Sequence, residues 1–208
     1  MPRARATFLF ALLTLLAAGC GDVAQADLGD AAFSAADAPG NWSPAPFGQA
    51  EAQPLWEVLP ELLVSNADAG LFIRAFTGPD GREGVSTILI ETDDPKAVPR
   101  IREGDRALAP LARLLDEQDA LLAPPVLGGD PGAYFTASDD PLPGALRSRL
   151  VRLLDEDERL YSDSLVFTNG PVLAVVTVWY PEDEGPVQDV EELAAGVQER
   201  VQDYLDQG

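Results

Sequence analysis

The sequence contains no histidine, one cysteine (Cys20) and one lysine (Lys96). It therefore lacks the residues for a Ser-His-Asp or Cys-His nucleophile, for an imidazole zinc site and for the commonest general base. Walker loops, Gly-x-Ser-x-Gly elbows and dinucleotide-binding glycine fingerprints are also absent. No disulfide can form within the chain, so the stability of the domain has to come from the packing of its core. These absences exclude most enzyme classes.

Basic residues are scarce, at 14 against 35 acidic ones, and the formal net charge is −21. Such a surface repels phosphate backbones and anionic lipid headgroups, which argues against nucleic-acid binding and leaves membrane attachment to a lipid. The excess charge predicts a solvated acidic coat; the alternative is a docking face for a basic partner. We expect a monomer.

The first residues have the pattern of a secretory leader. Arg3 and Arg5 precede an apolar run over residues 6–18. Thirteen helical residues span about 20 Å, which is too short for a hydrocarbon core of roughly 30 Å. The run is therefore typical of the apolar region of a signal peptide and not of a permanent transmembrane anchor.

The leader ends in Leu16-Ala17-Ala18-Gly19-Cys20. This stretch resembles the lipobox of bacterial lipoproteins, although Ala17 stands where that family usually has leucine. The resemblance implies that Cys20 is diacylated and becomes the new N-terminus, so that residues 1–20 form a lipoprotein signal. We then expect the protein to be lipid-anchored at the extracytoplasmic face of the bacterial cell membrane or envelope.

A second processing site competes with the lipobox. Ala24-Gln25-Ala26 has the small-x-small pattern that an ordinary signal peptidase cuts. Cleavage after Ala26 would discard Cys20 and release a freely secreted protein that starts at Asp27.

Residues 21–53 are rich in alanine, aspartate, glycine and proline and show no sustained helical or strand period. They are predicted to be a flexible acidic tether with a reach of roughly 30 Å. Its aromatic residues, Phe33, Trp42 and Phe47, either dock onto the core of the domain or form a recognition segment.

Residues 54–208 are predicted to form a single α+β domain. Residues 70–77 and 85–91 are apolar runs separated by a Gly/Pro/Asp turn, which predicts a β-hairpin. A helix follows, with leucines 108, 111, 115 and 122 on one stripe, and it stops before Pro124-Pro125.

A second strand-strand-helix unit lies near the C-terminus. Strands are predicted at 164–168 and 172–180 with a type I′ turn at Asn169-Gly170, and the long apolar run 172–180 is typical of a central strand covered on both faces. The last helix has Asp189 and Glu192 in capping-box positions and a buried stripe comprising Val190, Leu193, Val197, Val201 and Tyr204 or Leu205. The order suggests a degenerate ββα repeat; the alternative is two independent uses of a common local arrangement.

Between the two units we expect a short strand at 133–137 and a helix at 146–155, with leucines 146, 150, 153 and 154 turned inward. Together these elements predict a mainly antiparallel sheet of about five strands with helices packed on it. In outline this is similar to the α/β/α lipoprotein domains of PsbP-like proteins.

Carboxylates are the only abundant reactive groups, and they occur in runs at 93–94, 139–140, 155–158 and 182–184. None has the spacing of a calcium loop, and we expect no metal, cofactor or catalytic site. The four acids at 155–158 would oppose the dipole of a helix that ended there; the alternative is a solvated turn. The sequence predicts a non-catalytic binding or accessory module at the cell envelope with an envelope protein as partner; the alternative is an envelope hydrolase using an Asp/Glu pair.

Intact-mass spectrometry of membrane and culture-fluid fractions tests the lipobox prediction. We expect the membrane-bound protein to begin at Cys20 and to carry the added mass of acyl chains, and we expect Cys20→Ser to lose both. A soluble protein starting at Asp27 would establish free secretion instead.

Overall fold

The computed structural model describes residues 27–45, 52–64, 68–98, 108–122, 134–138, 142, 144–153 and 158–207. Within them, one seven-stranded sheet has the order β1-β2-β3-β7-β6-β5-β4, and all neighbouring strands are antiparallel. The predicted α+β class is confirmed, with more strands than the five expected. Cys20, the leader and residues 46–51 lie outside the described residues.

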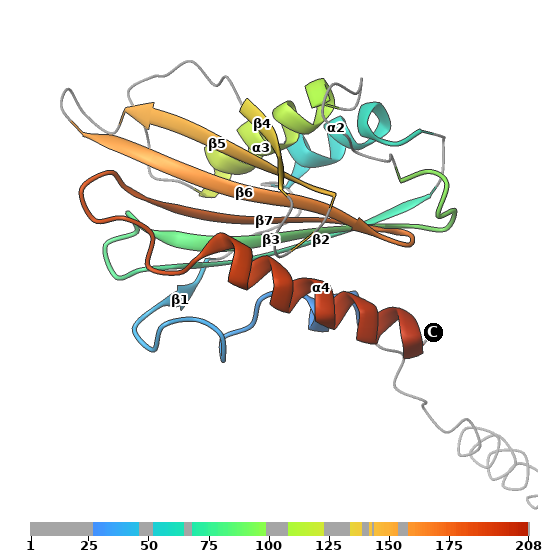
Figure 1. Ribbon diagram of the computed structural model, residues 1–208, viewed down its shortest axis with the longest axis horizontal. Coiled ribbons are helices and arrows are strands. Elements are labelled where there is room, and N and C mark those ends of the chain that lie inside the picture. Colours follow the sequence, from blue (N-terminus) through green and yellow to red (C-terminus); the bar gives the residue numbers. More distant parts are fainter. Residues whose placement is uncertain are drawn as a thin grey trace, which may run out of the picture.

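The strands are β1 (Ser43–Pro44), β2 (Ala69–Thr77), β3 (Gly84–Thr92), β4 (Tyr134–Ser138), β5 (Ala145–Leu153), β6 (Arg159–Asn169) and β7 (Val172–Pro181). The helices are the short 3-10 helix η1 (Leu28–Ala31) and the α-helices α2 (Gln53–Leu62), α3 (Leu108–Leu122) and α4 (Val190–Gln207). Figure 1 shows α2 and α3 on one face of the sheet and α4 on the other, so the domain has three layers.

Strand β7 is the middle strand of the sheet, and every one of its residues is buried. Its side chains alternate between the two cores. Val175 packs with α2 and α3, whereas Val176 packs with α4. The prediction of a central strand covered on both faces is confirmed, because one hydrophobic run supplies apolar side chains to both layers.

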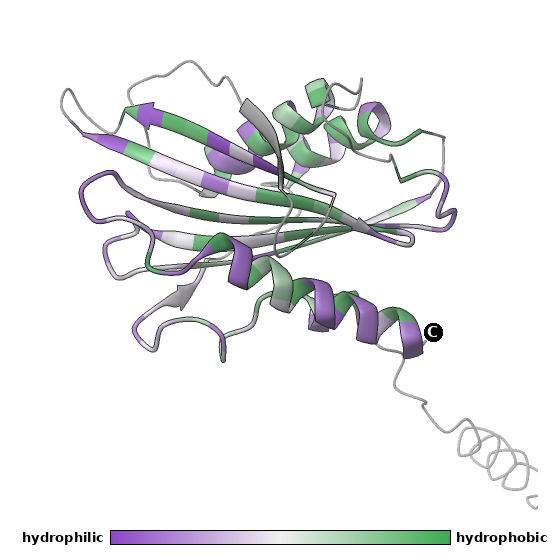
Figure 2. Ribbon diagram, viewed as in Figure 1, coloured by the Kyte–Doolittle hydropathy of each residue, from purple (hydrophilic) through white to green (hydrophobic). Residues whose placement is uncertain are grey.

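Helix α4 has the Asp189 cap that the sequence predicts, and of the predicted stripe Val190, Val197 and Val201 are buried while Leu193, Tyr204 and Leu205 are partly buried. The Asp189 carboxylate accepts hydrogen bonds from the backbone N–H groups of Glu191 (2.8 Å) and Glu192 (3.4 Å), which satisfies two donors of the first turn. Val197 and Val201 are fully buried against the sheet. Figure 2 shows the outward turns of α4 as hydrophilic and the central strands as mainly hydrophobic.

The predicted helix at 146–155 is wrong for the part that the structure describes, because residues 145–153 form β5. Leu146 and Leu150 are buried, as expected, but Leu153 is exposed. A spacing of four residues brings two side chains to one side of either a helix or a strand, so the leucines did not distinguish the two. The intervening arginines, Arg147 and Arg149, lie on the opposite side of the strand, and this alternation is the strand signal.

The turn between β6 and β7 differs from the predicted type I′ turn at Asn169-Gly170. Asn169 pairs with Val172, so the two loop residues are Gly170 and Pro171. Gly170 has a positive φ of 55°, whereas no described non-glycine residue has one. Glycine with positive φ at the first loop position is typical of a type II′ turn, in which Pro171 needs no N–H for pairing.

The N-terminal part of the predicted tether belongs to the domain. Residues 27–45 include η1 and β1, and Phe33 is fully buried in the core beneath α4, where its ring contacts Phe76 at 5.5 Å between centroids. This part of the predicted tether therefore packs against the core of the domain. The sequence of this segment shows no helical or strand periodicity, so only its tertiary contacts reveal that it packs against the core. Helix α2 was also not predicted.

The order strand-strand-helix occurs twice, as β2-β3-α3 and β6-β7-α4. The two hairpins meet where β3 pairs antiparallel with β7. A two-fold rotation that relates these antiparallel strands would place both helices on the same face, but α3 and α4 lie on opposite faces (Figure 1). The two units therefore share their order and not a rotational symmetry.

Gly84 tests the packing of the sheet centre. A Cβ at this position would lie 2.1 Å from Trp179 Cζ2 and 2.6 Å from the Phe76 carbonyl oxygen. We expect Gly84→Ala to lower the free energy of unfolding by about 1–3 kcal/mol, because the buried indole cannot move aside. Urea unfolding measures the change.

The control is Gly70→Ala in the neighbouring strand, where an added Cβ meets no atom within 4 Å. We expect Gly70→Ala to change the free energy of unfolding by less than about 0.5 kcal/mol. Equal effects at the two glycines would contradict the predicted clash.

Candidate functional site

The acidic runs that the sequence singles out do not form a site within the described residues. Residues 93–94 and 182–184 are exposed, and so is Lys96. Residues 139–140 and 155–157 lie outside the described part of the chain, and Glu158 forms an ion pair with Arg82. Since β5 precedes this last run, no helix dipole is opposed there.

The two buried carboxylates of the described residues lie on opposite faces of the sheet. Asp163 of β6 faces α4, whereas Asp119 belongs to α3 on the other side. Each is paired with arginine: Asp163 with Arg149, and Asp119 with Arg152 at 2.9 Å. They therefore cannot act together as the acid and base of one cleft.

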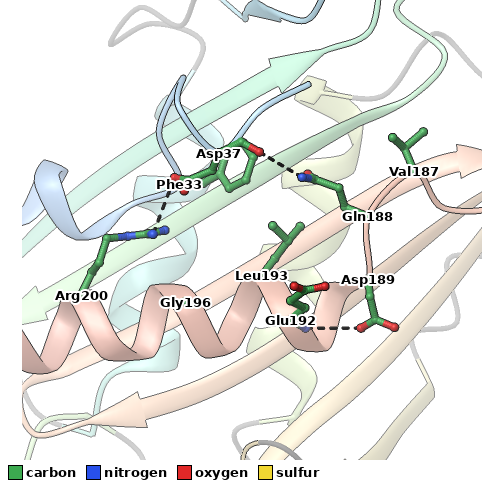
Figure 3. A pocket seen from close by; sticks show the side chains of 9 residues that line it. All are labelled: Phe33, Asp37, Val187, Gln188, Asp189, Glu192, Leu193, Gly196 and Arg200. Atoms are coloured by element: carbon green, nitrogen blue, oxygen red, sulfur yellow. Dashed lines mark hydrogen bonds and ion pairs between the residues drawn. The ribbon is translucent and has the colours of Figure 1, made fainter. Parts of the chain in front are cut away.

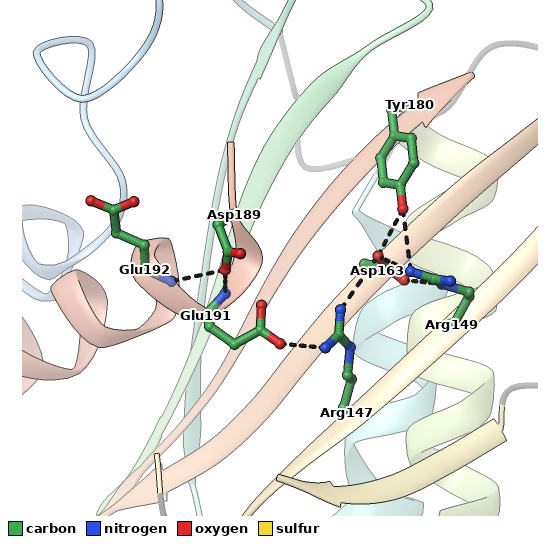
Figure 4. Close-up of polar contacts among 7 residues, drawn as sticks. All are labelled: Arg147, Arg149, Asp163, Tyr180, Asp189, Glu191 and Glu192. Atoms are coloured by element: carbon green, nitrogen blue, oxygen red, sulfur yellow. Dashed lines mark hydrogen bonds and ion pairs between the residues drawn. The ribbon is translucent and has the colours of Figure 1, made fainter. Parts of the chain in front are cut away.

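Asp163 is the centre of a polar network at the sheet surface (Figure 4). Arg149 donates two hydrogen bonds to its carboxylate, at 2.5 and 2.6 Å, and the Tyr180 hydroxyl donates a third at 2.9 Å. Arg147 lies 3.7 Å from the same carboxylate. These donors compensate the charge of Asp163, which is only 5% exposed.

Two tyrosine rings pack beside the charged groups of the network. The Tyr161 and Tyr180 rings stack at 5.9 Å, and the Arg149 guanidinium lies 5.4 Å from the Tyr161 centroid. Burial, helped by the hydrogen bond to Asp163, raises the pKa of Tyr180 to about 12. Tyr180 therefore stays neutral near pH 7 and acts as a hydrogen-bond donor.

The first turn of α4 connects this network to a cleft on the other side of the helix. Glu191 forms a short ion pair with Arg147. Asp189 caps the helix, and hydrogen bonding with the Glu191 side chain lowers the pKa of Asp189. Glu192 lies beside the cap, on the side of the cleft (Figure 3).

The cleft lies between α4 and the segment at 33–37, and its volume is about 360 Å³. Figure 3 shows the residues that line it: Phe33, Asp37, Val187, Gln188, Asp189, Glu192, Leu193, Gly196 and Arg200. Three of them are carboxylates and one is a cation. Clefts of this size accommodate a side chain or a small ligand.

Asp37 is the best-supported carboxylate of the cleft. It accepts hydrogen bonds from the Ser34 backbone N–H (2.8 Å) and hydroxyl (2.7 Å), and Arg200 lies 3.6 Å away. Burial acts to raise the pKa of Asp37, but these partners outweigh it and lower the pKa. Gln188 donates to the Asp37 carbonyl at 3.0 Å and so ties the two walls of the cleft together.

A second hollow, of about 390 Å³, lies beside β1 and β2. Its lining is mainly small and apolar, and Arg74 is its only charged residue. It offers few groups that could orient a polar ligand, so the acidic cleft beside α4 is the better candidate site.

Within the described residues, no group of three or more cysteine, aspartate or glutamate side chains is placed to hold a metal ion. No helix of this part of the chain is long and apolar enough to cross a membrane. No family model matches the chain, and no curated protein matches it significantly.

Neither the cleft nor the Asp163 network was predicted from the sequence. Cys20, the only predicted site residue, lies outside the described residues. The alternation of Arg147 and Arg149 along β5 was the available signal for the network, but it requires β5 to be recognised as a strand. The cleft carried no sequence signal, because its walls are more than 140 residues apart.

Replacing Asp163 by asparagine tests the network. Asp163→Asn leaves two arginines without their buried counter-charge, so we expect the free energy of unfolding to fall by about 2 kcal/mol. Urea denaturation measures it.

The control is Glu61→Gln, which removes the ion pair of Glu61 with Arg113. That pair has a similar distance, 2.7 Å, but both side chains are about half exposed, at 53% and 52%. Since exposed pairs add little stability, we expect no resolvable change of the urea midpoint. Equal losses in the two variants would show that burial of Asp163 does not matter.

Proposed function

We propose that this protein is a non-catalytic binding module, lipid-anchored through Cys20 at the extracytoplasmic face of a bacterial envelope. Its cleft between residues 33–37 and α4 binds a basic segment of an envelope protein. The observation that carries the proposal is the composition of the cleft, with the carboxylates of Asp37, Asp189 and Glu192 around a single cation, Arg200.

The charges of the cleft favour a cationic ligand. Arg200 is already engaged by Asp37 and by the Ala31 carbonyl, to which it donates at 3.3 Å. Glu192 remains exposed at the rim. The net charge of −21 on the whole chain adds a long-range attraction that speeds the approach of a basic partner.

The apolar part of the lining suits the stem of a long basic side chain. Phe33 and Leu193 provide apolar walls, and Val187 is 48% exposed at the entrance. Lysine and arginine bury their methylene stems on such surfaces while their charged ends contact carboxylates. One basic side chain would use both kinds of contact.

The protonation states support binding rather than catalysis. The pKa values of Asp37 and Asp189 are both lowered, so both groups are ionised near pH 7 and neither is a general acid. The lining contains no hydroxyl, thiol or amine nucleophile.

Lipid attachment at Cys20 would keep the cleft close to the membrane. Six residues, 21–26, lie between Cys20 and Asp27, with which the described part of the chain begins. Seven peptide steps span at most about 24 Å. With Cys20 lipidated, η1, which packs against α4, would therefore stay near the lipid surface.

Charge reversal on α4 tests the proposal. A short peptide of alternating glycine and arginine is titrated into the mature protein by calorimetry, at low and at physiological ionic strength. We expect Glu192→Lys to weaken binding by about tenfold or more, because it places a cation at the rim of the cleft.

The matched control is Glu199→Lys, which makes the same charge change at an exposed position of the same helix outside the cleft. We expect it to weaken binding much less. Equal losses in the two variants would mean that the peptide senses only the overall charge, and the proposed site would be wrong.

A further inference from the structure

A row of hydroxyl side chains crosses the sheet beneath α3. Ser86, Thr177, Ser164 and Ser148 are register partners on β3, β7, β6 and β5, and all are almost completely buried. Strands in a sheet lie about 4.8 Å apart, so the row is continuous across four strands. It forms a polar band across this interface.

The side chains of the band are small in comparison with those of the neighbouring row. Two residues further along each strand, on the same face, lies a row of branched apolar side chains that pack against α2 and α3: Ile88, Val175, Val166 and Leu146. A hydroxyl side chain fills less volume than these branched side chains. Proteins hold internal water beside buried polar groups of this kind.

Some polar groups of this interface have a protein partner. Gln118 of α3 donates to the Ser86 hydroxyl at 2.5 Å, and the hydroxyls of Ser164 and Thr177 are 2.8 Å apart. Asp119 is paired with Arg152. Burial raises the pKa of Asp119 even though the charge of Arg152 acts to lower it, so this carboxylate sits in a poorly solvated environment.

Within the described residues, four polar atoms of the same interface have no hydrogen-bond partner: Gln118 Oε1, Ser148 Oγ, Ser162 Oγ and Trp179 Nε1. Each of these residues is at most 2% exposed. The set contains an acceptor, two hydroxyls and a donor. A buried polar group without a partner is destabilising and rare, so four on one side of a sheet call for a ligand that both donates and accepts.

We propose that ordered water molecules bind between α3 and the sheet and satisfy these atoms. Trp179 lies two residues beyond Thr177 on β7, and Thr177 pairs with Ser86, the partner of Gln118. One water near Gln118 and Trp179 accepts from the indole N–H and donates to the amide oxygen, and it lies within reach of the Ser162 hydroxyl, because Ser162 pairs with Trp179 across β6 and β7. A second water binds Ser148 at the other end of the band.

Nuclear magnetic resonance of the full mature protein tests the first water. We expect a nuclear Overhauser cross-peak between water and the Trp179 indole proton, because that proton is buried beside the proposed site. Trp42→Phe and Trp56→Phe assign the other two indole signals, since the chain has three tryptophans.

The sign of a stability change tests the second water. Removing a hydroxyl that is bonded to water is destabilising, whereas removing a buried hydroxyl without any partner is stabilising. We expect Ser148→Ala to lower the urea midpoint. Ser164→Ala is the control, since it removes a hydrogen bond to Thr177 and lowers the midpoint in either case.

The proposal requires both results. A missing cross-peak at Trp179, or a raised urea midpoint for Ser148→Ala, overturns it.

Discussion

The burial of β7 on both faces is the constraint on which the rest of the structure depends. Its ten residues are all buried, and successive side chains enter opposite cores. An apolar strand of this kind is stable only when both faces of the sheet are covered, so α2 and α3 must pack on one side and α4 on the other. The three layers follow from the composition of one strand.

The two faces of the sheet differ in where their buried polar groups lie. On the α4 side, the polar residues gather at Asp163, where arginine and tyrosine donors surround a single carboxylate. On the α3 side, hydroxyl groups run across the centre of the sheet, and Asp119 is joined to Arg152. One side thus concentrates its charges at the margin of a mainly apolar core, while the other carries a polar band through the helix-sheet interface.

The first turn of α4 contributes both to the stability of the fold and to the proposed binding site. Within four residues, Asp189 caps the helix, Glu191 reaches the arginine network and Glu192 faces the cleft. The opposite wall of the cleft comes from the N-terminal segment around Phe33, whose burial holds that segment against α4. The segment next to the proposed anchor therefore also forms part of the proposed binding site.

The sequence by itself determined both hairpins, the helices α3 and α4 and the central position of β7, because local periodicity, turn residues and a cap residue specify them. Only the tertiary structure decided that β5 is a strand, because a four-residue leucine spacing fits both a strand and a helix. It alone also revealed the docking of Phe33, the burial of Asp163 and the cleft. These depend on contacts between residues far apart in the chain, and no local pattern of side chains records which distant segments will meet.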